Sequence, residues 1–365
     1  MELRLNRAEF LAELLPMQGI VERRTTIPVL SHLLLRAVGD KLHIAATDLD
    51  VSLTSSVTAE VKREGGVAVQ AKKFVEIIRS LVGDEVKLVL DDSHALTVTA
   101  ASSRFKIHGL APQDFPSLPD VGQEKPVEMP FQILRRMIGR VIFAVSTEES
   151  RFQLNGALVK LKVNGLEIVA TDGHRLALVE DAVADVKEAD GVLVPRKALL
   201  EIQRFEGEGN VAYRRGEHHL SFRIGRRELI CRILEGTFPD YERVIAKDND
   251  RKVIFDRLGL QATVQRVAIL TGERARAVRL QFSNGKLTVS AANPDLGEAS
   301  EEIACDYEGG DLKLGINPDY MVQFLSAADT EKVRLELKDE NTQCVGFPVG
   351  GEDQRYLCVI MPMRV

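Results

Sequence analysis

No apolar run in this sequence of 365 residues approaches the roughly 18 residues that a membrane span requires. The start, Met1 to Arg4, also lacks the basic and then apolar pattern of a signal peptide. The four cysteines lie among apolar neighbours, none at a CxxC or zinc-ligand spacing: Cys231, Cys305, Cys344 and Cys358. These absences predict a cytoplasmic protein whose cysteines are buried free thiols in a reducing compartment.

The sequence also lacks the motifs of common catalytic sites. It contains no GxSxG, no HExxH and no GxxxxGK followed by Ser or Thr. His174 stands beside Asp172 in a polar turn, but no second histidine or carboxylate pair stands at metal-ligand spacing. A lone histidine in a turn more often orders a loop or contacts a partner. An enzyme acting at the Asp172/His174 loop is therefore an alternative hypothesis, and no catalytic residue or metal site is predicted.

An excess of basic residues is missing too. The 48 lysines and arginines are outnumbered by 54 aspartates and glutamates, which gives a formal net charge of −6. On net charge alone, this balance argues against a nonspecific nucleic-acid binder. Only an uneven distribution of the basic residues could produce a surface that holds a polyanion.

A strand-turn-strand segment is present, and it recurs. Residues 168–179 read IVATDGHRLALV, in which a polar turn separates two short apolar runs rich in β-branched residues. Similar strand ends read ATD at 46–48 and AAN at 291–293, so positions 47, 171 and 292 are separated by 124 and 121 residues. A unit that recurs three times in a chain of this length predicts three domains.

Each repeat shows the patterns of two amphipathic helices and several short strands. The helices are expected near residues 6–15, 72–82, 131–145, 196–205, 255–270 and 318–327. The strands are expected at 33–37, 41–47, 51–57, 67–69, 86–90, 95–100, 104–110, 154–163, 166–171, 278–282, 286–291 and 356–361. We therefore predict an α+β chain of three repeated domains, 1–122, 127–245 and 246–365, each with two helices packed on antiparallel sheets.

Basic residues gather on the solvent faces of these helices. Any one basic helix face is more often a plain solvated surface than a nucleic-acid contact. Here corresponding helices of successive repeats share the feature: Lys72, Lys73 and Arg79; Arg135, Arg136 and Arg140; Arg196, Lys197 and Arg204; Arg257 and Arg266. The recurrence predicts a surface that holds a polyanion without reading its bases.

Several motifs, in order along the whole chain, carry a resemblance to a known family. They are ATDGHRLA at 170–177, FPDY at 238–241 and MPMRV at 361–365, with RR and PVL between 23 and 30 and LNG ending at 156. Each motif is weak alone, but together and at these intervals they are highly specific. The sequence resembles the bacterial DNA polymerase III β subunit family, the sliding clamps.

The resemblance implies a processivity factor: a head-to-tail homodimeric ring of six similar clamp domains that encircles duplex DNA, with helices lining the hole and sheets outside. It also implies a groove between the second and third domains that takes short linear motifs. The partners would be the replicative polymerase α subunit, the clamp loader, other polymerases and mismatch-repair proteins. Neither catalysis nor a cofactor is implied. A structural repeat protein with no DNA in its hole is the remaining alternative.

The resemblance assigns groove positions residue by residue. They are Leu154, Thr171, Gly173, His174, Arg175, Leu176, Pro239, Arg243 and Val244, and, nearer the carboxyl end, Asn317, Tyr320, Val359, Ile360, Met361, Pro362, Met363 and Arg364. Apolar side chains with flexible Met363 suit an adaptable pocket for a leucine or phenylalanine anchor, and Arg175 and Arg243 are expected at its rim. Ala275 and the Gln343–Gly351 loop depart from the family pattern.

The resemblance likewise implies DNA-facing residues and a dimer seam. The DNA-facing set is Arg23, Arg24, Lys72, Lys73, Arg79, Arg136, Arg140, Arg196 and Lys197. The seam set is Arg104, Phe105 and Ile107 of the first domain against Ile269 and Leu270 of the third, with Glu298, Glu301 or Glu302 as ion-pair partners for Arg104. Ordinary core packing is the alternative for each apolar seam residue.

Overall fold

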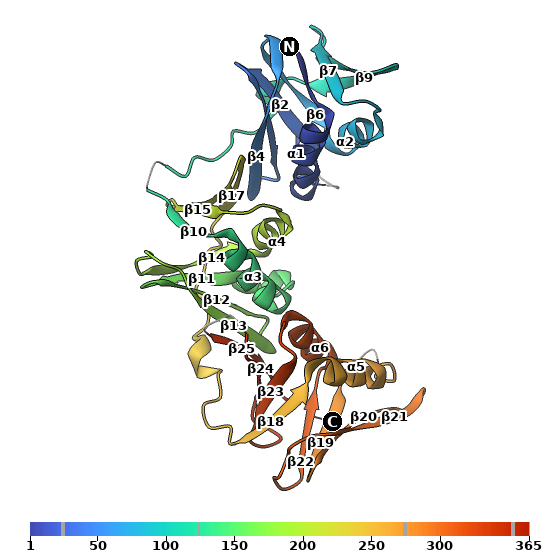
Figure 1. The fold of residues 1–365 in the computed structure, drawn as a ribbon, viewed down its shortest axis with the longest axis vertical. Coiled ribbons are helices and arrows are strands. Elements are labelled where there is room, and N and C mark those ends of the chain that lie inside the picture. Colours follow the sequence, from blue (N-terminus) through green and yellow to red (C-terminus); the bar gives the residue numbers. More distant parts are fainter. Residues whose placement is uncertain (23–25, 123–124, 273–275, 352–354, 365) are drawn as a thin grey trace. The chain divides into compact units, whose positions relative to one another are not determined.

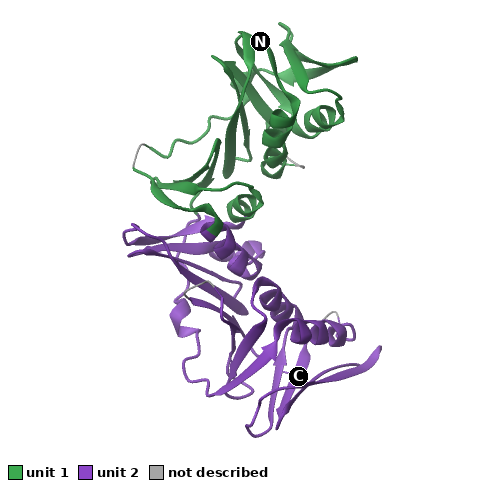
Figure 2. Ribbon diagram, viewed as in Figure 1, with its two compact units in different colours: residues 1–132, 197–233 green, residues 133–196, 234–365 purple. Residues whose placement is uncertain are grey.

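The computed structural model describes residues 1–22, 26–122, 125–272, 276–351 and 355–364. The chain forms two compact units, coloured separately in Figure 2: unit 1 comprises residues 1–132 and 197–233, and unit 2 comprises residues 133–196 and 234–365. Along the described chain, α-helices stand between runs of several antiparallel strands, which confirms the α+β prediction (Figure 1). Among the described residues, no helix is both long and apolar enough to cross a membrane. The predicted domain limits stay a prediction.

Unit 1 is built on a 13-stranded sheet in the order β10-β15-β16-β17-β4-β3-β2-β6-β9-β8-β7-β1-β5. Its strands are β1 (Glu2–Asn6), β2 (His32–Val38), β3 (Lys41–Thr47), β4 (Val51–Thr58), β5 (Glu60–Arg63), β6 (Gly65–Gln70), β7 (Glu85–Leu90), β8 (Ala95–Ala100), β9 (Ser103–Leu110), β10 (Val127–Pro130), β15 (Asn210–Arg215), β16 (His219–Ile224) and β17 (Arg227–Arg232). Its helical segments are α1 (Arg7–Ile20), η1 (Pro28–Ser31), α2 (Ala71–Ser80), η2 (Pro112–Asp114) and most of α4 (Arg196–Arg204). Helix α1 packs on β3, β4 and α2. The rings of Phe10 and Phe74 meet edge to face in this core, 5.8 Å apart.

Unit 2 contains an eight-stranded sheet, β14-β11-β12-β13-β25-β24-β23-β18, and a four-stranded sheet, β21-β20-β19-β22. The strands are β11 (Gly156–Lys162), β12 (Gly165–Thr171), β13 (Arg175–Ala182), β14 (Ala189–Pro195), β18 (Arg251–Asp256), β19 (Val278–Ser283), β20 (Lys286–Asn293), β21 (Gly297–Ala304), β22 (Leu312–Ile316), β23 (Lys332–Leu337), β24 (Cys344–Val349) and β25 (Arg355–Ile360). The helical segments are most of α3 (Phe131–Val141), η3 (Ile142–Ala144), η4 (Glu149–Leu154), η5 (Tyr241–Arg243), α5 (Arg257–Ala268) and α6 (Pro318–Ala327). Helices α5 and α6 pack side by side (Figure 1).

Helix caps explain several helix starts. The Asn6 side chain accepts a hydrogen bond from the Glu9 backbone N–H at 3.0 Å, which satisfies a donor that the first turn of α1 leaves free. Asn317 caps α6 in the same way, through the Asp319 N–H at 2.9 Å, and Pro318 suits the first helical position. The helix expected near residues 6–15 therefore begins directly after its cap, Asn6.

Three differences from the sequence-based expectations concern unit 2. The helix expected at 131–145 ends as α3 at Val141, and the apolar residues that follow form the 3-10 turn η3. The strand expected from residue 154 begins at Gly156, because η4 occupies the preceding residues. The segment 343–351, expected as a loop, contains β24, which pairs with β23 and β25 on its two sides.

The sheets continue from one repeat into the next. Strand β4 pairs with β17 in unit 1, and β13 pairs with β25 in unit 2. Strands β4, β13 and β21 each follow the recurring turn, whereas β9, β17 and β25 each close a repeat. The member of each set that is left over, β21 in the first and β9 in the second, has an open edge within the described chain. Strand β21 ends its sheet, and β9 meets β6 only through Gly109 and Leu110.

Gly156 offers a test of this packing. Its α-carbon lies against the edge of β14, where an added Cβ would clash with the Val194 carbonyl oxygen and come within 2.7 Å of Leu234 Cδ1. We expect Gly156→Ala to lower the free energy of unfolding by about 1–3 kcal/mol, because the obstacle is backbone that cannot rotate away. Gly310→Ala is the matched control, since nothing lies within 4 Å of its Cβ position. Urea unfolding of both variants measures the difference, and equal stabilities would contradict this packing.

Candidate functional site

The recurring turn between β12 and β13 is ordered by its own side chains. Asp172 Oδ1 accepts hydrogen bonds from the backbone N–H groups of His174 at 2.9 Å and Arg175 at 3.0 Å. Thr171 Oγ1 donates to the Arg175 carbonyl oxygen at 2.6 Å and accepts from the Gly173 N–H at 3.1 Å. Gly173 has φ of +88°, a conformation that glycine adopts without steric cost. The Asp172 carboxylate therefore builds a turn.

The corresponding turn of the first repeat has the same geometry. Asp48 Oδ1 accepts from the N–H groups of Asp50 at 3.0 Å and Val51 at 2.6 Å, and the Leu49 N–H donates to Thr47 Oγ1 at 3.0 Å. Leu49 has φ of +81° at the position equivalent to Gly173. In the third repeat, Asn293 Oδ1 accepts from the Asp295 N–H at 2.9 Å. The same polar turn thus serves as a scaffold three times, which favours a structural role for Asp172 over a catalytic one.

Arg175 points inward and joins three segments of unit 2. Its guanidinium donates to Asp172 Oδ2 at 3.0 Å, to Gln323 Oε1 on α6 and to the Phe143 carbonyl oxygen in η3. The same group lies over the Tyr320 ring, 4.3 Å from its centroid. Only 9% of Arg175 is exposed. The expectation that Arg175 lies at a groove rim is therefore wrong, because internal partners occupy its donors. Of the two arginines, only Arg243 is exposed.

The predicted groove residues converge in unit 2 on an apolar cluster. Strand pairing sets Leu176 opposite Val359 and Arg175 opposite Ile360. The cluster consists of Val169, Leu176, Leu178, Tyr241, Ile245, Val345, Leu357 and Val359, with Leu158, Phe238, Val244, Ala246 and Phe347 packed against it. Its members come from β12, β13, β24, β25 and the segment around η5. Residues nearly two hundred positions apart in sequence therefore share one core.

The predicted groove residues fall into two groups by exposure: buried residues, called the floor here, and residues that reach the surface. The floor residues are buried: Leu154, Thr171, Arg175, Leu176, Val359 and Ile360. The others reach the surface wholly or in part: Gly173, His174, Pro239, Arg243, Val244, Asn317, Tyr320, Met361, Pro362, Met363 and Arg364. Two backbone bonds hold the terminal segment, from Met361 N–H to the His174 carbonyl oxygen at 2.9 Å and from Met363 N–H to the Gly315 carbonyl oxygen at 2.8 Å. A surface of half-exposed apolar side chains over a packed floor suits an apolar peptide anchor.

Sequence reasoning missed Val345, Phe347 and the support beneath Tyr241. Val345 and Phe347 are apolar and stand two positions apart on β24. This period-two spacing is a signal that could have indicated a strand. The Tyr241 hydroxyl donates to the buried Glu167 carboxylate at 2.6 Å. Burial raises the pKa of Glu167, but hydrogen bonds from Lys162 and Tyr241 lower it further, so the net pKa lies below the ordinary value. This charged group anchors η5 under the apolar surface.

The predicted DNA-facing residues differ in exposure and in whether an internal partner holds the side chain. On α2, Lys72, Lys73 and Arg79 are exposed, with Lys73 paired to Glu76 at 2.8 Å. Arg196 is half-buried. Arg136 pairs with Asp181, and Lys197 pairs with Asp48 and donates to the Ile20 carbonyl oxygen. Arg23 and Arg24 lie outside the described residues, as does Ala275, one of the departures from the family pattern.

Arg140 does not fit a DNA-facing role. Only 3% of it is exposed, and its guanidinium contacts Asp329, the Ala327 carbonyl oxygen and the Tyr356 ring. Helical periodicity put Arg140 on a solvent face, but remote segments of unit 2 cover that face. We therefore omit Arg140 from the residues proposed below.

The predicted seam residues are largely exposed. On β9, Arg104 and Phe105 are exposed and Ile107 is half-buried. Ile269, just after α5, is 74% exposed, and Leu270 is half-buried. On β21, Glu298 is exposed, Glu301 pairs with Arg266 and Glu302 pairs with Lys286. Ordinary core packing therefore does not account for Phe105 or Ile269.

No group of three or more potential metal ligands occurs among the residues that the structure describes. The four cysteines are free, and all except half-buried Cys305 are buried. Burial raises the pKa of the Cys231, Cys344 and Cys358 thiols, which keeps them protonated near neutral pH. The cysteines are inert packing residues in this setting.

Comparisons with known proteins cover the whole chain. Three sequence models of the DNA polymerase III beta subunit match: the N-terminal domain at residues 1–119, the central domain at 128–240 and the C-terminal domain at 242–364. The beta sliding clamp of Pseudomonas putida is 38% identical over 369 residues, and that of Caulobacter vibrioides is 35% identical over 374 residues. Each alignment covers 100% of both chains.

Solved structures agree with these sequence matches. The DnaN sliding clamp of Pseudomonas aeruginosa bound to griselimycin has a TM-score of 0.94 at 36% identity and covers 100% of both chains. The DNA polymerase III beta subunit of Thermotoga maritima has a TM-score of 0.93 at 26% identity, covering 100% of this chain and 99% of that one.

Arg175 and Arg243 allow a matched test of the site geometry. Arg175→Met would leave the Asp172 carboxylate without its ion-pair partner and remove the hydrogen bond from the turn to Gln323 on α6. We therefore expect the free energy of unfolding to fall by about 3–5 kcal/mol. Arg243 is a control because its pair with Asp240 is 86% and 59% exposed, and Arg243→Met should cost no more than about 1 kcal/mol. Urea unfolding with hydrogen exchange of β12 and β13 measures both. Comparable losses would show that Arg175 has no special structural role.

Proposed function

Because this chain belongs to the family of DNA polymerase III beta subunits, the beta sliding clamps, we propose that it closes into a homodimeric ring around duplex DNA. The chain is a non-catalytic processivity factor of DNA replication. The observation that carries this conclusion is the match of all three domain models, in order, over almost the entire sequence. We propose domain limits of 1–122, 127–245 and 246–365 within it.

The strand pattern supports a specific closure of the ring. Within the chain, a strand after the recurring turn pairs twice with a strand that ends a repeat, as β4 with β17 and β13 with β25. The remaining pair of the series is β21 with β9, and both have open edges among the described residues. An unpaired edge presents backbone donors and acceptors that another strand can satisfy. We propose that β21 of one chain pairs with β9 of its partner, twice per ring.

Exposed apolar residues border both proposed edges. Phe105 lies on β9 itself, and Ile269 follows α5, which packs against β21. Burying such side chains between chains would remove apolar surface from water, which is the main favourable term in association. Arg104 and Glu298 are both exposed and of opposite charge, so they suit an ion pair at the edge of the seam. This is the head-to-tail arrangement of a dimeric clamp.

We propose that the exposed basic residues contact DNA phosphates loosely. Lys72, Lys73 and Arg79 have the freedom to do so, and Arg196 is also retained; Arg136 and Lys197 would have to exchange their internal partners. Phosphate contacts carry no sequence information, so a clamp held by them can slide. The partner would be duplex DNA of any sequence.

We propose that the surface over the unit 2 cluster binds short linear motifs of the replicative polymerase, the clamp loader, other polymerases and mismatch-repair proteins. Val244, Met361 and Met363 are half-exposed there, and thioether side chains adapt to different anchors. Exposed Arg243 is suited to an acidic residue of the peptide. An extended segment with leucine or phenylalanine anchors fits this combination.

A circular-DNA experiment tests the clamp function and the seam together. The intact protein should stay on nicked circular plasmid after loading and leave linearised plasmid by its ends. We expect Ile269→Ala with Leu270→Ala to abolish retention on circles, because each buried truncation removes about 2–5 kcal/mol and occurs at both seams. The control is Ile254→Ala with Leu258→Ala, two exposed apolar residues in the same region that are not assigned to the seam.

Light scattering at submicromolar concentration reports the oligomeric state of the same variants. A fully dimeric Ile269→Ala, Leu270→Ala variant would place the seam elsewhere. Equal retention of the intact protein on circular and linear DNA would overturn the ring.

A truncation tests the peptide site. Deleting residues 361–365 removes the backbone bonds of Met361 and Met363 and the half-exposed side chains of both methionines. Binding of a polymerase-derived peptide that ends in Leu-Phe should weaken at least about tenfold, which corresponds to 1.4 kcal/mol. The dimer should persist, because the proposed seam uses other strands. Undiminished affinity in a fluorescence titration, or hydrogen-exchange protection of another surface by the peptide, would refute the assignment.

A further inference from the structure

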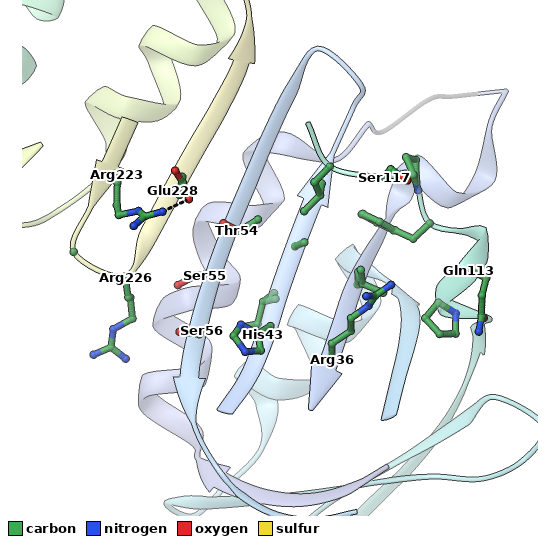
Figure 3. Close-up of a pocket in the computed structure, with 18 residues that line it drawn as sticks. Arg36, His43, Thr54, Ser55, Ser56, Gln113, Ser117, Arg223, Arg226 and Glu228 are labelled. Atoms are coloured by element: carbon green, nitrogen blue, oxygen red, sulfur yellow. Dashed lines mark hydrogen bonds and ion pairs between the residues drawn. The ribbon is translucent and has the colours of Figure 1, made fainter. Parts of the chain in front are cut away.

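A cavity lies in unit 1 and involves none of the groove residues. Its volume is about 990 Å³. Figure 3 shows it on one face of the sheet, with residues from β16, β17, β4, β3 and β2 along its base. The hairpin turn at Gly225 and Arg226 borders one side, and the segment from Pro112 to Leu118 borders the other.

Strand register explains which side chains meet there. Cα partners across antiparallel strands present their side chains on the same sheet face. One row therefore runs Arg223, Glu228, Thr54, Ala45 and Leu34 from β16 to β2. Because neighbouring strands are about 4.8 Å apart, this row is about 19 Å long, the length of roughly six extended residues.

A second row across three of these strands adds Ser56, His43 and Arg36. Arg36 pairs with Gly66 on β6 as well. A Cβ on Gly66 would lie 3.1 Å from Arg36 Cγ and 3.4 Å from Pro112 Cβ, so the glycine leaves room for both. The arginine and the 112–118 segment are thus packed against the same strand.

The cavity is cationic although the chain as a whole is acidic. Arg36, Arg223 and Arg226 contribute three positive charges against the single carboxylate of Glu228. Arg223 forms an ion pair with that carboxylate at 2.8 Å, so these two charges offset each other. Burial raises the pKa of Glu228, but hydrogen bonds from Ser221 and Arg223 outweigh burial and lower it. The local excess therefore resides in Arg36 and Arg226.

These two arginines lack strong partners. Among the described residues, the Arg36 side chain makes no hydrogen bond or ion pair, and Figure 3 shows its guanidinium apart from the other labelled charges. Within the same described ranges, the Arg226 side chain pairs only with Glu9, at 3.8 Å, and both side chains are about half exposed. Such an exposed pair contributes little and exchanges readily for a better one. Both guanidinium groups are available to carboxylates of a ligand.

The other half of the cavity is apolar. Leu34, Ala45 and Phe115 belong to a small buried cluster on this sheet face, and half-exposed Leu118 packs against it. Pro112 and Pro116 complete this wall. Phe115 is only 6% exposed, so it offers no ring face on which a base could stack. Aliphatic side chains suit this wall better than a nucleotide does.

We propose that this cavity is a second docking site, which binds an extended acidic and aliphatic segment of a partner protein. Carboxylates of the segment pair with Arg36 and Arg226, and an aliphatic side chain packs against Leu118 and the prolines. Hydroxyl groups of Thr54, Ser56 and Ser117 accept or donate hydrogen bonds along its backbone. The proposal does not rest on the ring, the DNA contacts or the groove.

The test uses the full-length protein and a fluorescein-labelled peptide, Glu-Val-Asp-Glu-Val-Asp, which lacks the leucine and phenylalanine anchors expected for the groove. Arg36→Glu with Arg226→Glu should weaken binding at least about tenfold. Lys62→Glu with Lys187→Glu is the control, since it changes net charge equally at exposed lysines outside the cavity. Leu118→Ser keeps every charge and should also weaken binding. Hydrogen exchange should slow in β2 and in residues 112–118.

Several results would overturn the proposal. The first is no binding at millimolar peptide. The second is an equal loss of affinity in the two double variants. The third is full affinity in Leu118→Ser, because binding would then be charge attraction alone. Protection of another surface would do the same. So would displacement of the peptide by equimolar ADP or duplex DNA, because the ligand class would then be a nucleotide or nucleic acid. Circular dichroism confirms that each variant is folded.

Discussion

Backbone hydrogen bonding between strands of different repeats is the constraint on which this structure depends. A sheet edge in each repeat leaves N–H and C=O groups that need partners. The chain satisfies them by pairing β4 with β17 and β13 with β25, so sheets run on without interruption at these junctions. The cavity in unit 1 and the apolar cluster in unit 2 both lie on strands that flank such a junction. Both proposed peptide sites therefore lie where repeats are joined.

The recurring turn precedes the strands that form these junctions and fixes where they begin. In the first and second repeats, a threonine hydroxyl and an aspartate carboxylate hold the turn, and the strand that follows pairs across the junction. In the second repeat, Arg175 is added to this scaffold and brings α6 and η3 against the turn. The terminal segment then bonds to the His174 carbonyl oxygen on the outside of the same turn. A motif that looks catalytic in sequence is thus an architectural element.

The sequence predicted features that depend on neighbouring residues and missed those that depend on remote ones. Capping by Asn6, the polar turns and the exposed face of α2 follow from local patterns. The burial of Arg140 does not, because Asp329 and Tyr356 come from segments far along the chain. The inward direction of Arg175 is set in the same way by Phe143, Tyr320 and Gln323. Strand β24 escaped prediction because Gly346 and Pro348 weaken its local signal, while pairing on both sides holds it in place.

The pairing of β4 with β17 also determines how junctions respond to dilution. Both strands belong to one covalent chain, so each sees the other at an effective concentration that the connecting segments set, in the millimolar range for a short flexible link. Diluting the protein leaves this local concentration unchanged. A junction between separate chains has no such tether, and its occupancy follows the bulk protein concentration by mass action. A junction within one chain and a junction between two chains can share one hydrogen-bonding pattern. They would still differ in lifetime and in their sensitivity to protein abundance, without any difference in contact chemistry.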